Sequence, residues 1–138
     1  MKKFNALMAL MPIFASLMLF AFTIPQEQKK PGPWDIPEKY QKMKNPIPDD
    51  AASLRTGKML WGKYCKACHG NTGKGDGPKA AQLKTALIDL TSAEFKKIPD
   101  GHLYYMSIIG RDEMTNFESE IPDEDDRWAV INYMKTLK

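Results

Sequence analysis

The chain has only two cysteines, and they lie three residues apart. Cys65 and Cys68 are followed at once by His69, so the pattern C-x-x-C-H stands at the end of a helical pattern of apolar residues. Two thiols this close in the chain do not cross-link distant parts of a fold, as the several disulfides of small exported domains do. The pair therefore serves one local purpose, beside the end of that helix.

The spacing of these three residues is that of the attachment site for haem c. Two thiols at the end of a helix reach the two vinyl groups on one edge of a porphyrin, and each thiol forms a thioether. His69 then falls beneath the iron and supplies one axial nitrogen. The sequence thus predicts one covalent haem c, with Cys65 and Cys68 as its anchors and His69 as an iron ligand.

Two other kinds of site use closely spaced cysteines. A C-x-x-C redox pair lies at the start of a helix that follows a strand, whereas Cys65 and Cys68 end a helical pattern. A structural zinc site needs four ligands. Here Cys65, Cys68 and His69 provide three crowded ones, and the only other histidine is His102. Both alternatives are therefore disfavoured.

The second axial ligand is predicted from the methionines. Haem iron in electron carriers often takes a methionine sulfur opposite histidine, which raises the reduction potential. Of the nine methionines, four lie within the first 24 residues and Met43 lies in a proline-rich segment. Three fall within predicted helices and are expected in the core: Met59, Met106 and Met134. Met114 alone lies in a predicted loop between helices, so it is the predicted ligand, with His102 as the alternative.

The N-terminal segment predicts export. Two lysines precede the apolar run 4–24, as in a signal peptide. Twenty-one residues at 1.5 Å each would span about 31 Å, close to the thickness of a bilayer core. Residues 1–24 are therefore either a cleaved signal peptide or a membrane anchor. In both cases the rest of the chain is periplasmic, soluble or tethered to the outer face of the cytoplasmic membrane.

The remaining chain divides in two. Residues 25–49 contain six prolines and predict an extended tether, because proline interrupts a continuous helix. Residues 50–138 predict one all-α domain with three to five helices around the haem. A helix is expected from Asp50 or Ser53 to Cys68, another within 99–109, and a last one capped by Asp123.

Charge is unevenly distributed along the chain. Residues 26–84 hold 12 Lys and Arg against 6 Asp and Glu, whereas residues 85–138 hold 6 against 11. This mixture excludes nucleic acid, which needs a concentrated basic face, and predicts a charge dipole suited to docking. The lysines near the cysteines either steer acidic partners or only keep the surface soluble. They are Lys58, Lys63, Lys66, Lys74 and Lys79.

Residues 50–138 resemble a class I monohaem cytochrome c. Gly57 and Trp61 match the small and aromatic residues that meet the last helix in this family, and Val130 and Tyr133 match the residues they meet. The resemblance implies an all-α cytochrome c fold in which α-helices wrap one haem.

Two loops extend the resemblance. The run 73–78 is similar to the family's loop, in which a proline carbonyl accepts a hydrogen bond from the axial histidine, so the resemblance assigns Pro78 to holding His69. The runs 110–114 and 125–128 resemble the methionine-ligand loop and the last helix. Thr115 departs from the pattern, since proline often follows the ligand methionine.

The function implied is outer-sphere electron transfer by a single-electron carrier of a respiratory or related chain. With His69 and Met114 both on the iron, no substrate reacts at the metal, so no catalytic residue and no enzyme are expected. Redox proteins are the expected partners: a respiratory complex, an oxidase or a reductase. Two rival functions are a fixed subunit of a membrane respiratory complex and a haem-based sensor or enzyme in which Met114 dissociates.

Overall fold

The computed structural model describes residues 27–138, and the structural statements below refer to these residues. They form helices and no β-strand, with two isolated bridges, Lys29 with Thr85 and Arg111 with Met114. The predicted all-α fold is confirmed. In chain order the helical elements are α2 (Glu38–Gln41), α3 (Ala51–Leu60), η3 (Trp61–Cys65), α4 (Lys66–His69), η4 (Ala80–Gln82), η5 (Phe95–Lys97), α5 (Asp100–Tyr104), η6 (Tyr105–Ile109) and α6 (Glu124–Thr136).

The predicted signal or anchor, residues 4–24, lies outside the described residues. Between residues 27 and 138, no helix is both long and apolar enough to cross a bilayer.

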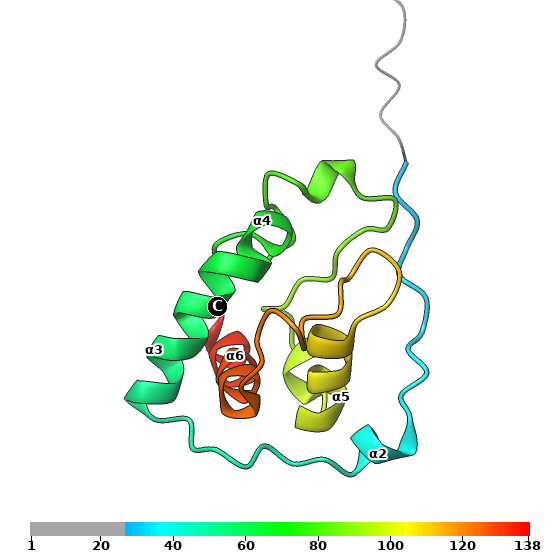
Figure 1. The fold of residues 1–138 in the computed structure, drawn as a ribbon. Coiled ribbons are helices and arrows are strands. Elements are labelled where there is room, and N and C mark those ends of the chain that lie inside the picture. The colour runs from blue at the N-terminus through cyan, green and yellow to red at the C-terminus, as the bar shows by residue number, and fades with distance from the viewer. Residues whose placement is uncertain (1–26) are drawn as a thin grey trace, which may run out of the picture.

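The first long helix runs without a break through α3, η3 and α4 (Figure 1). Asp50 caps it, since its carboxylate accepts hydrogen bonds from the N–H groups of Ala52 and Ser53 at 3.0 and 2.9 Å. This helix is as predicted, except that η3 is a π-helical turn. Such turns often occur at functional sites, and this one ends at Cys65.

This helix packs across α6 (Figure 1). Gly57 makes the close approach possible, because a Cβ there would lie 2.0 Å from the carbonyl oxygen of Ala129 and 2.8 Å from Cβ of Tyr133. The rings of Trp61 and Tyr133 have centroids 6.1 Å apart. The expected meeting of Gly57 and Trp61 with the last helix is therefore confirmed.

The core lies between this helix, α6 and the continuous pair α5–η6. Asp123 caps α6, accepting from the N–H groups of Asp125 and Asp126, as predicted. The largest fully buried side chains are Trp128, Leu103, Ile108, Ile131 and Val130. Met134 is buried as expected, but Met59 is 64% exposed. The expectation that Met59 lies in the core is wrong, because it lies on the outer side of α3.

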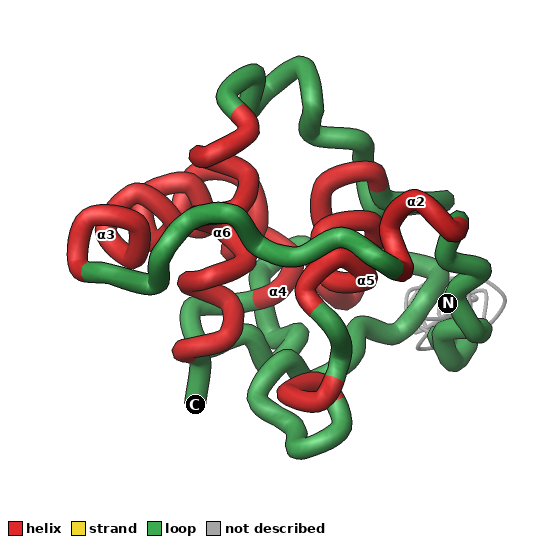
Figure 2. The backbone as a smooth tube through the Cα atoms, turned by 90° about the horizontal axis from the view of Figure 1, so that it is seen from below, coloured by secondary structure: helices red, strands yellow, loops and turns green. Residues whose placement is uncertain are grey.

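The proline-rich segment is packed against the domain from Gln28 onward. It follows one edge of the molecule and then crosses beneath α5 and α6 to reach α3 (Figures 1 and 2). Ile36 is buried, and the ring of Tyr40 lies 6.2 Å from that of Tyr104. Farther on, the amide of Asn45 donates to the side-chain oxygen of Asn132 at 2.6 Å. Apart from the short helix α2, the described part of the segment is extended, and it is part of the folded body.

Candidate functional site

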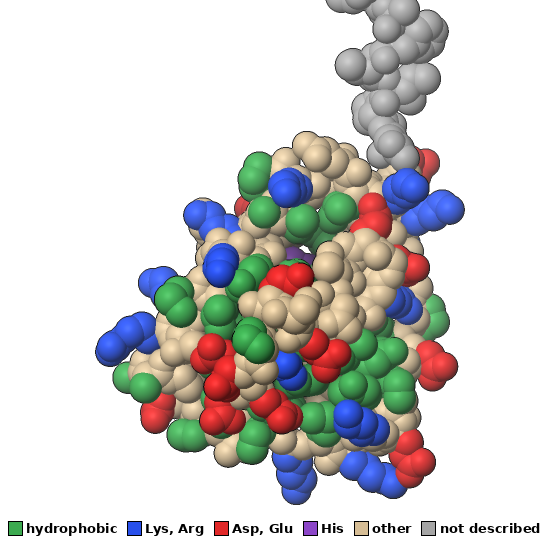
Figure 3. Space-filling model, in the orientation of Figure 1, with side chains coloured by type: hydrophobic (Ala, Val, Ile, Leu, Met, Phe, Trp, Pro, Cys, Tyr) green, Lys and Arg blue, Asp and Glu red, His purple; other side chains and the backbone are tan. Residues whose placement is uncertain are grey.

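A cavity of about 470 Å³ opens between the end of the first long helix, the α5–η6 pair and the loops 79–90 and 110–115. Figure 3 shows a hollow in this face of the molecule with a histidine side chain visible inside it. Ligand sites usually have volumes of roughly 300–1,000 Å³ and mostly apolar walls. Cys65, Cys68, His69 and Met114 all line this cavity. The structure thus brings together the four side chains that the sequence singled out.

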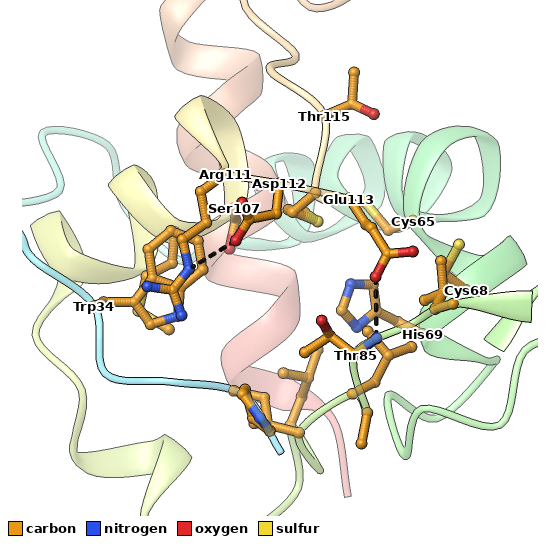
Figure 4. Close-up of a pocket in the computed structure, with 18 of the residues that line it drawn as sticks. Trp34, Cys65, Cys68, His69, Thr85, Ser107, Arg111, Asp112, Glu113 and Thr115 are labelled. Carbon is orange, nitrogen blue, oxygen red and sulfur yellow. Dashed lines mark hydrogen bonds and ion pairs between the residues drawn. The ribbon is translucent and has the colours of Figure 1, made fainter. Parts of the chain in front are cut away.

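The two cysteines lie at the end of the π-turn and in α4, on the same side of the cavity as His69 (Figure 4). Both thiols are free; Cys65 is buried and Cys68 is half-buried. Burial, aided by the nearby Cys68, raises the pKa of the Cys65 thiol to about 12. Cys65 is therefore a neutral thiol at physiological pH and directly borders the apolar space.

His69 ends α4. Burial lowers the pKa of its imidazole below the ordinary value, so the ring is neutral near pH 7. A neutral imidazole has a free lone pair, as a metal ligand needs. Nδ1 of His69 is buried and has no hydrogen-bond partner among residues 27–138. Nδ1 therefore still needs a hydrogen-bond partner at this site.

Pro78 follows a loop that returns to the cysteine motif. The N–H of Gly77 donates to the carbonyl of Cys68 at 3.1 Å, and that of Lys79 donates to Ala67 at 2.9 Å. These bonds place Pro78 beside the motif. The hydrogen bond from His69 that the resemblance implied is not formed in the described structure, since Nδ1 has no partner.

Met114 lies in the methionine loop, defined here as residues 110–115. Its N–H donates to the carbonyl of Arg111 at 2.8 Å, which closes a tight turn. Gly110 has a φ of +70°, and a Cβ there would lie 2.1 Å from the carbonyl oxygen of Met114, so only glycine fits. The carboxylate of Glu113 accepts from the N–H groups of Lys84 and Thr85, each at 3.0 Å. The residues that lead up to Met114 are therefore held at Arg111 and at Glu113.

The other candidates for a second ligand differ in position. Met106 and Met134 also line the cavity, whereas His102, in α5, does not. Met106 was expected in the core, and its helical position did not reveal that it faces this space. Lining residues that the sequence did not assign to the site also include Trp34 and Arg111. A tryptophan within a proline-rich segment was the available signal, because such a large side chain gains by packing.

The residues fit a large apolar cofactor that carries its own metal. Among the described residues, no three His, Cys, Asp or Glu side chains gather to hold a metal ion by themselves. The cavity instead offers two thiols, one neutral imidazole with an unpartnered nitrogen, and thioether sulfur. With the helix crossing at Gly57, this arrangement defines a c-type cytochrome domain.

A comparison with known protein families supports this assignment. The family model described as "Cytochrome C oxidase, cbb3-type, subunit III" matches residues 52–134. The chain belongs to this family, and its cofactor is haem c, bound covalently and containing iron. Domains of this family act in haem-based electron transfer, and c-type cytochrome domains are generally exported. No curated protein matches the sequence.

Proposed function

We propose that this chain is a single-electron carrier of a respiratory or related electron-transfer chain. In this proposal Cys65 and Cys68 form the thioethers to haem, and His69 and Met114 are the axial ligands. The observation that supports it best is that these four side chains, from two separate segments, line one cavity. When bound, haem c supplies one-electron chemistry, because its iron cycles between the ferrous and ferric states.

His69 is suited to its proposed role by burial, which keeps the imidazole neutral. With one ring nitrogen as the ligand, Nδ1 carries the proton and needs an acceptor. We propose the carbonyl of Pro78, next in the chain to the anchored Gly77, as that acceptor. Such a hydrogen bond fixes the tautomer and the orientation of the ring.

The apolar walls and the thioether of Met114 are expected to raise the reduction potential. A low-dielectric surrounding disfavours the additional charge of the ferric form, and methionine ligation acts in the same direction. No catalytic residue is needed, since both axial positions stay filled. The chain's own residues only bind the cofactor, orient it and exclude water.

We further propose that some exposed lysines near the cysteines steer acidic redox partners. Lys58, Lys63 and Lys66 lie on the helix that carries the cysteines. Electrostatic steering raises association rates and weakens with salt, since the Debye length is about 10 Å at 0.1 M. Electron-transfer rates with the physiological partner are expected to fall as ionic strength rises. A rate independent of salt would leave these lysines as ordinary surface residues.

Mass spectrometry of the purified, exported chain tests haem attachment. The expected mass includes one haem, and the same spectrum shows whether residues 1–24 have been removed. Cys65→Ser is expected to reduce covalent attachment to one thioether, and the double replacement with Cys68→Ser to abolish it. A colourless wild-type chain with two free thiols would overturn the proposal.

Visible absorption tests the second ligand. The ferric protein is expected to show the methionine–iron band, which Met114→Ala abolishes while the potential drops. Met106→Leu, a change in another methionine that lines the same cavity, keeps the band. A band that survives Met114→Ala and disappears in the Met106 variant would move the assignment to Met106.

A second candidate is a fixed subunit of a membrane respiratory complex. It is favoured by the matched family, whose description names subunit III of a cbb3-type cytochrome c oxidase. The proposed organisation suits both roles: residues 1–24 are the signal or anchor and 50–138 are the haem domain. Residues 25–49 join the two and pack on the domain from Gln28 onward. Recovery of the chain from salt-washed membranes together with other subunits supports this candidate; recovery as a free periplasmic protein supports the carrier.

A further inference from the structure

The segment that precedes the haem domain contacts the site at two points. We call residues 28–36 the strap. At its start, the N–H of Lys29 donates to the carbonyl of Lys84, and its own carbonyl accepts from the N–H of Ala86, both at 2.8 Å. The side-chain amide of Gln28 donates to the carbonyls of Ala80 and Leu83. The strap is thereby paired with the loop on one side of the cavity.

The second contact is with Arg111 of the methionine loop. Its guanidinium carbon lies 4.0 Å from the centre of the Trp34 ring, a cation–π arrangement. The same guanidinium donates to the carbonyls of Pro33 and Gly32, at 2.5 and 2.6 Å. Figure 4 shows Trp34 and Arg111 stacked on the side of the site away from Cys65 and Cys68. Arg111 uses both its fork of N–H donors and the flat face of its guanidinium here, and a lysine side chain has neither.

Both contacts restrain the turn that ends at Met114. Arg111, held by the strap, accepts the hydrogen bond from the N–H of Met114. Glu113, on the other side, accepts from Lys84 and Thr85, whose backbone is paired with the strap at Lys29. The turn between them is tight, since Asp112 has a φ of 51° in the left-handed region. The strap therefore restrains the methionine loop from both ends of this turn.

We infer that Trp34 and Arg111 are positioning residues that keep the sulfur of Met114 on the iron. The inference rests on the proposed ligation by Met114. An open loop frees a coordination position, and the apparent affinity for a small ligand scales with the open fraction. The strap thus decides whether the haem is a closed electron carrier or a site that admits small molecules.

The test uses the full exported, haem-loaded chain with Trp34→Ala, Arg111→Ala and both together. The three readouts are the methionine–iron band, the reduction potential and carbon monoxide binding to the ferrous protein. Each single variant is expected to weaken the band, lower the potential and raise the apparent affinity for carbon monoxide about ten-fold. Trp34→Ala removes the cation–π contact, and Arg111→Ala removes that contact together with the hydrogen bonds to Pro33 and Gly32. Because Trp34 acts through Arg111, the double variant is expected to lose little more than Arg111→Ala alone.

Three comparisons make the test specific. Arg55→Ala changes an exposed arginine of α3 and is expected to leave all three readouts as in wild type. Trp34→Phe keeps a ring beneath the guanidinium and should recover most of the band, which also covers the case in which Trp34→Ala does not fold. Arg111→Lys keeps the charge but not the fork of donors, and it is expected to behave like Arg111→Ala.

The outcomes separate the two proposals. If wild type lacks the methionine–iron band, ligation by Met114 is wrong and the inference fails with it. If wild type has the band, and Trp34→Ala, Trp34→Phe and Arg111→Ala keep wild-type band, potential and carbon monoxide binding, the ligation stands and the strap does not position Met114.

Discussion

The indole Nε1 of Trp61 donates a hydrogen bond to the carbonyl oxygen of Gly70, 3.2 Å away inside the domain. Gly70 directly follows His69, and the rings of Trp61 and His69 have centroids 5.8 Å apart. One side chain of the π-turn therefore restrains both the backbone beyond the histidine and the imidazole itself. Because the same ring contacts α6, helix packing and placement of His69 depend on each other.

Gly57→Ala is expected to destabilise the protein. The new Cβ would lie 2.0 Å from the carbonyl oxygen of Ala129, and backbone on both helices must shift to relieve this contact. Overpacking of this kind costs about 1–3 kcal/mol in the free energy of unfolding. Denaturant unfolding of the haem-loaded protein measures it.

Gly62→Ala is the matched control for Gly57→Ala. Gly62 lies in the same helix, but no atom lies within 4 Å of a Cβ built there. Alanine is favoured over glycine in helices by about 1 kcal/mol, so this variant is expected to gain stability. Equal effects of the two replacements would show that the helices do not cross as closely as described.

Asn132→Ala tests the polar contact that joins the proline-rich segment to the helices. Asn132 is buried, accepts from Asn45, and donates to the carbonyl of Pro48 and the hydroxyl of Ser53. Its removal leaves these groups without a partner, which costs about 1–3 kcal/mol. Asn71→Ala, at an exposed position, should change stability by less than about 0.5 kcal/mol.

Two methionines are expected to differ in their contribution to stability. Met59 is 64% exposed and Met134 is 4% exposed. Met134→Ala is therefore expected to lower the free energy of unfolding by about 2–5 kcal/mol, and Met59→Ala by less than about 0.5 kcal/mol. A large loss in the Met59 variant would contradict its position on the outer side of α3.

Asp89 is expected to titrate below the ordinary range of aspartate. The hydroxyl of Thr91 and then its backbone N–H donate to the carboxylate and lower its pKa. Because the folded-state pKa lies below the unfolded one, this turn adds stability at neutral pH, and the contribution is lost as pH falls through the folded-state pKa. NMR titration of the reduced protein should show a higher pKa in Thr91→Val and a low pKa retained in Thr91→Ser.

Local chemistry predicted much of this fold. The caps at Asp50 and Asp123 follow from what one residue type can do at the start of a helix. The close approach at Gly57 followed from the resemblance to a known family. The grouping of Cys65, Cys68 and His69 needed only their adjacency in the chain. The place of Met114 followed from a loop position and the chemistry of haem.

Other features depend on contacts between distant segments. The π-turn at 61–65 inserts a residue without altering the apolar pattern enough to be recognised, and Met59 shows that a helical apolar residue need not face the core. Proline content predicted an extended chain at 25–49 but did not predict the part of the domain on which this segment packs. The contact between Trp34 and Arg111 joins residues far apart in sequence, and neither residue alone indicates the other.

The contact between Asn45 and Asn132 has a consequence for how this protein is delimited. The residues recognised by family comparison start at 52, yet a buried side chain of α6 takes its partner from residue 45. A boundary drawn at residue 52 would remove Asn45 and leave Asn132 without this partner. Truncated chains that begin near residue 50 would lack this contact. Weak haem binding by such a chain would then result from the truncation and not from the haem site itself.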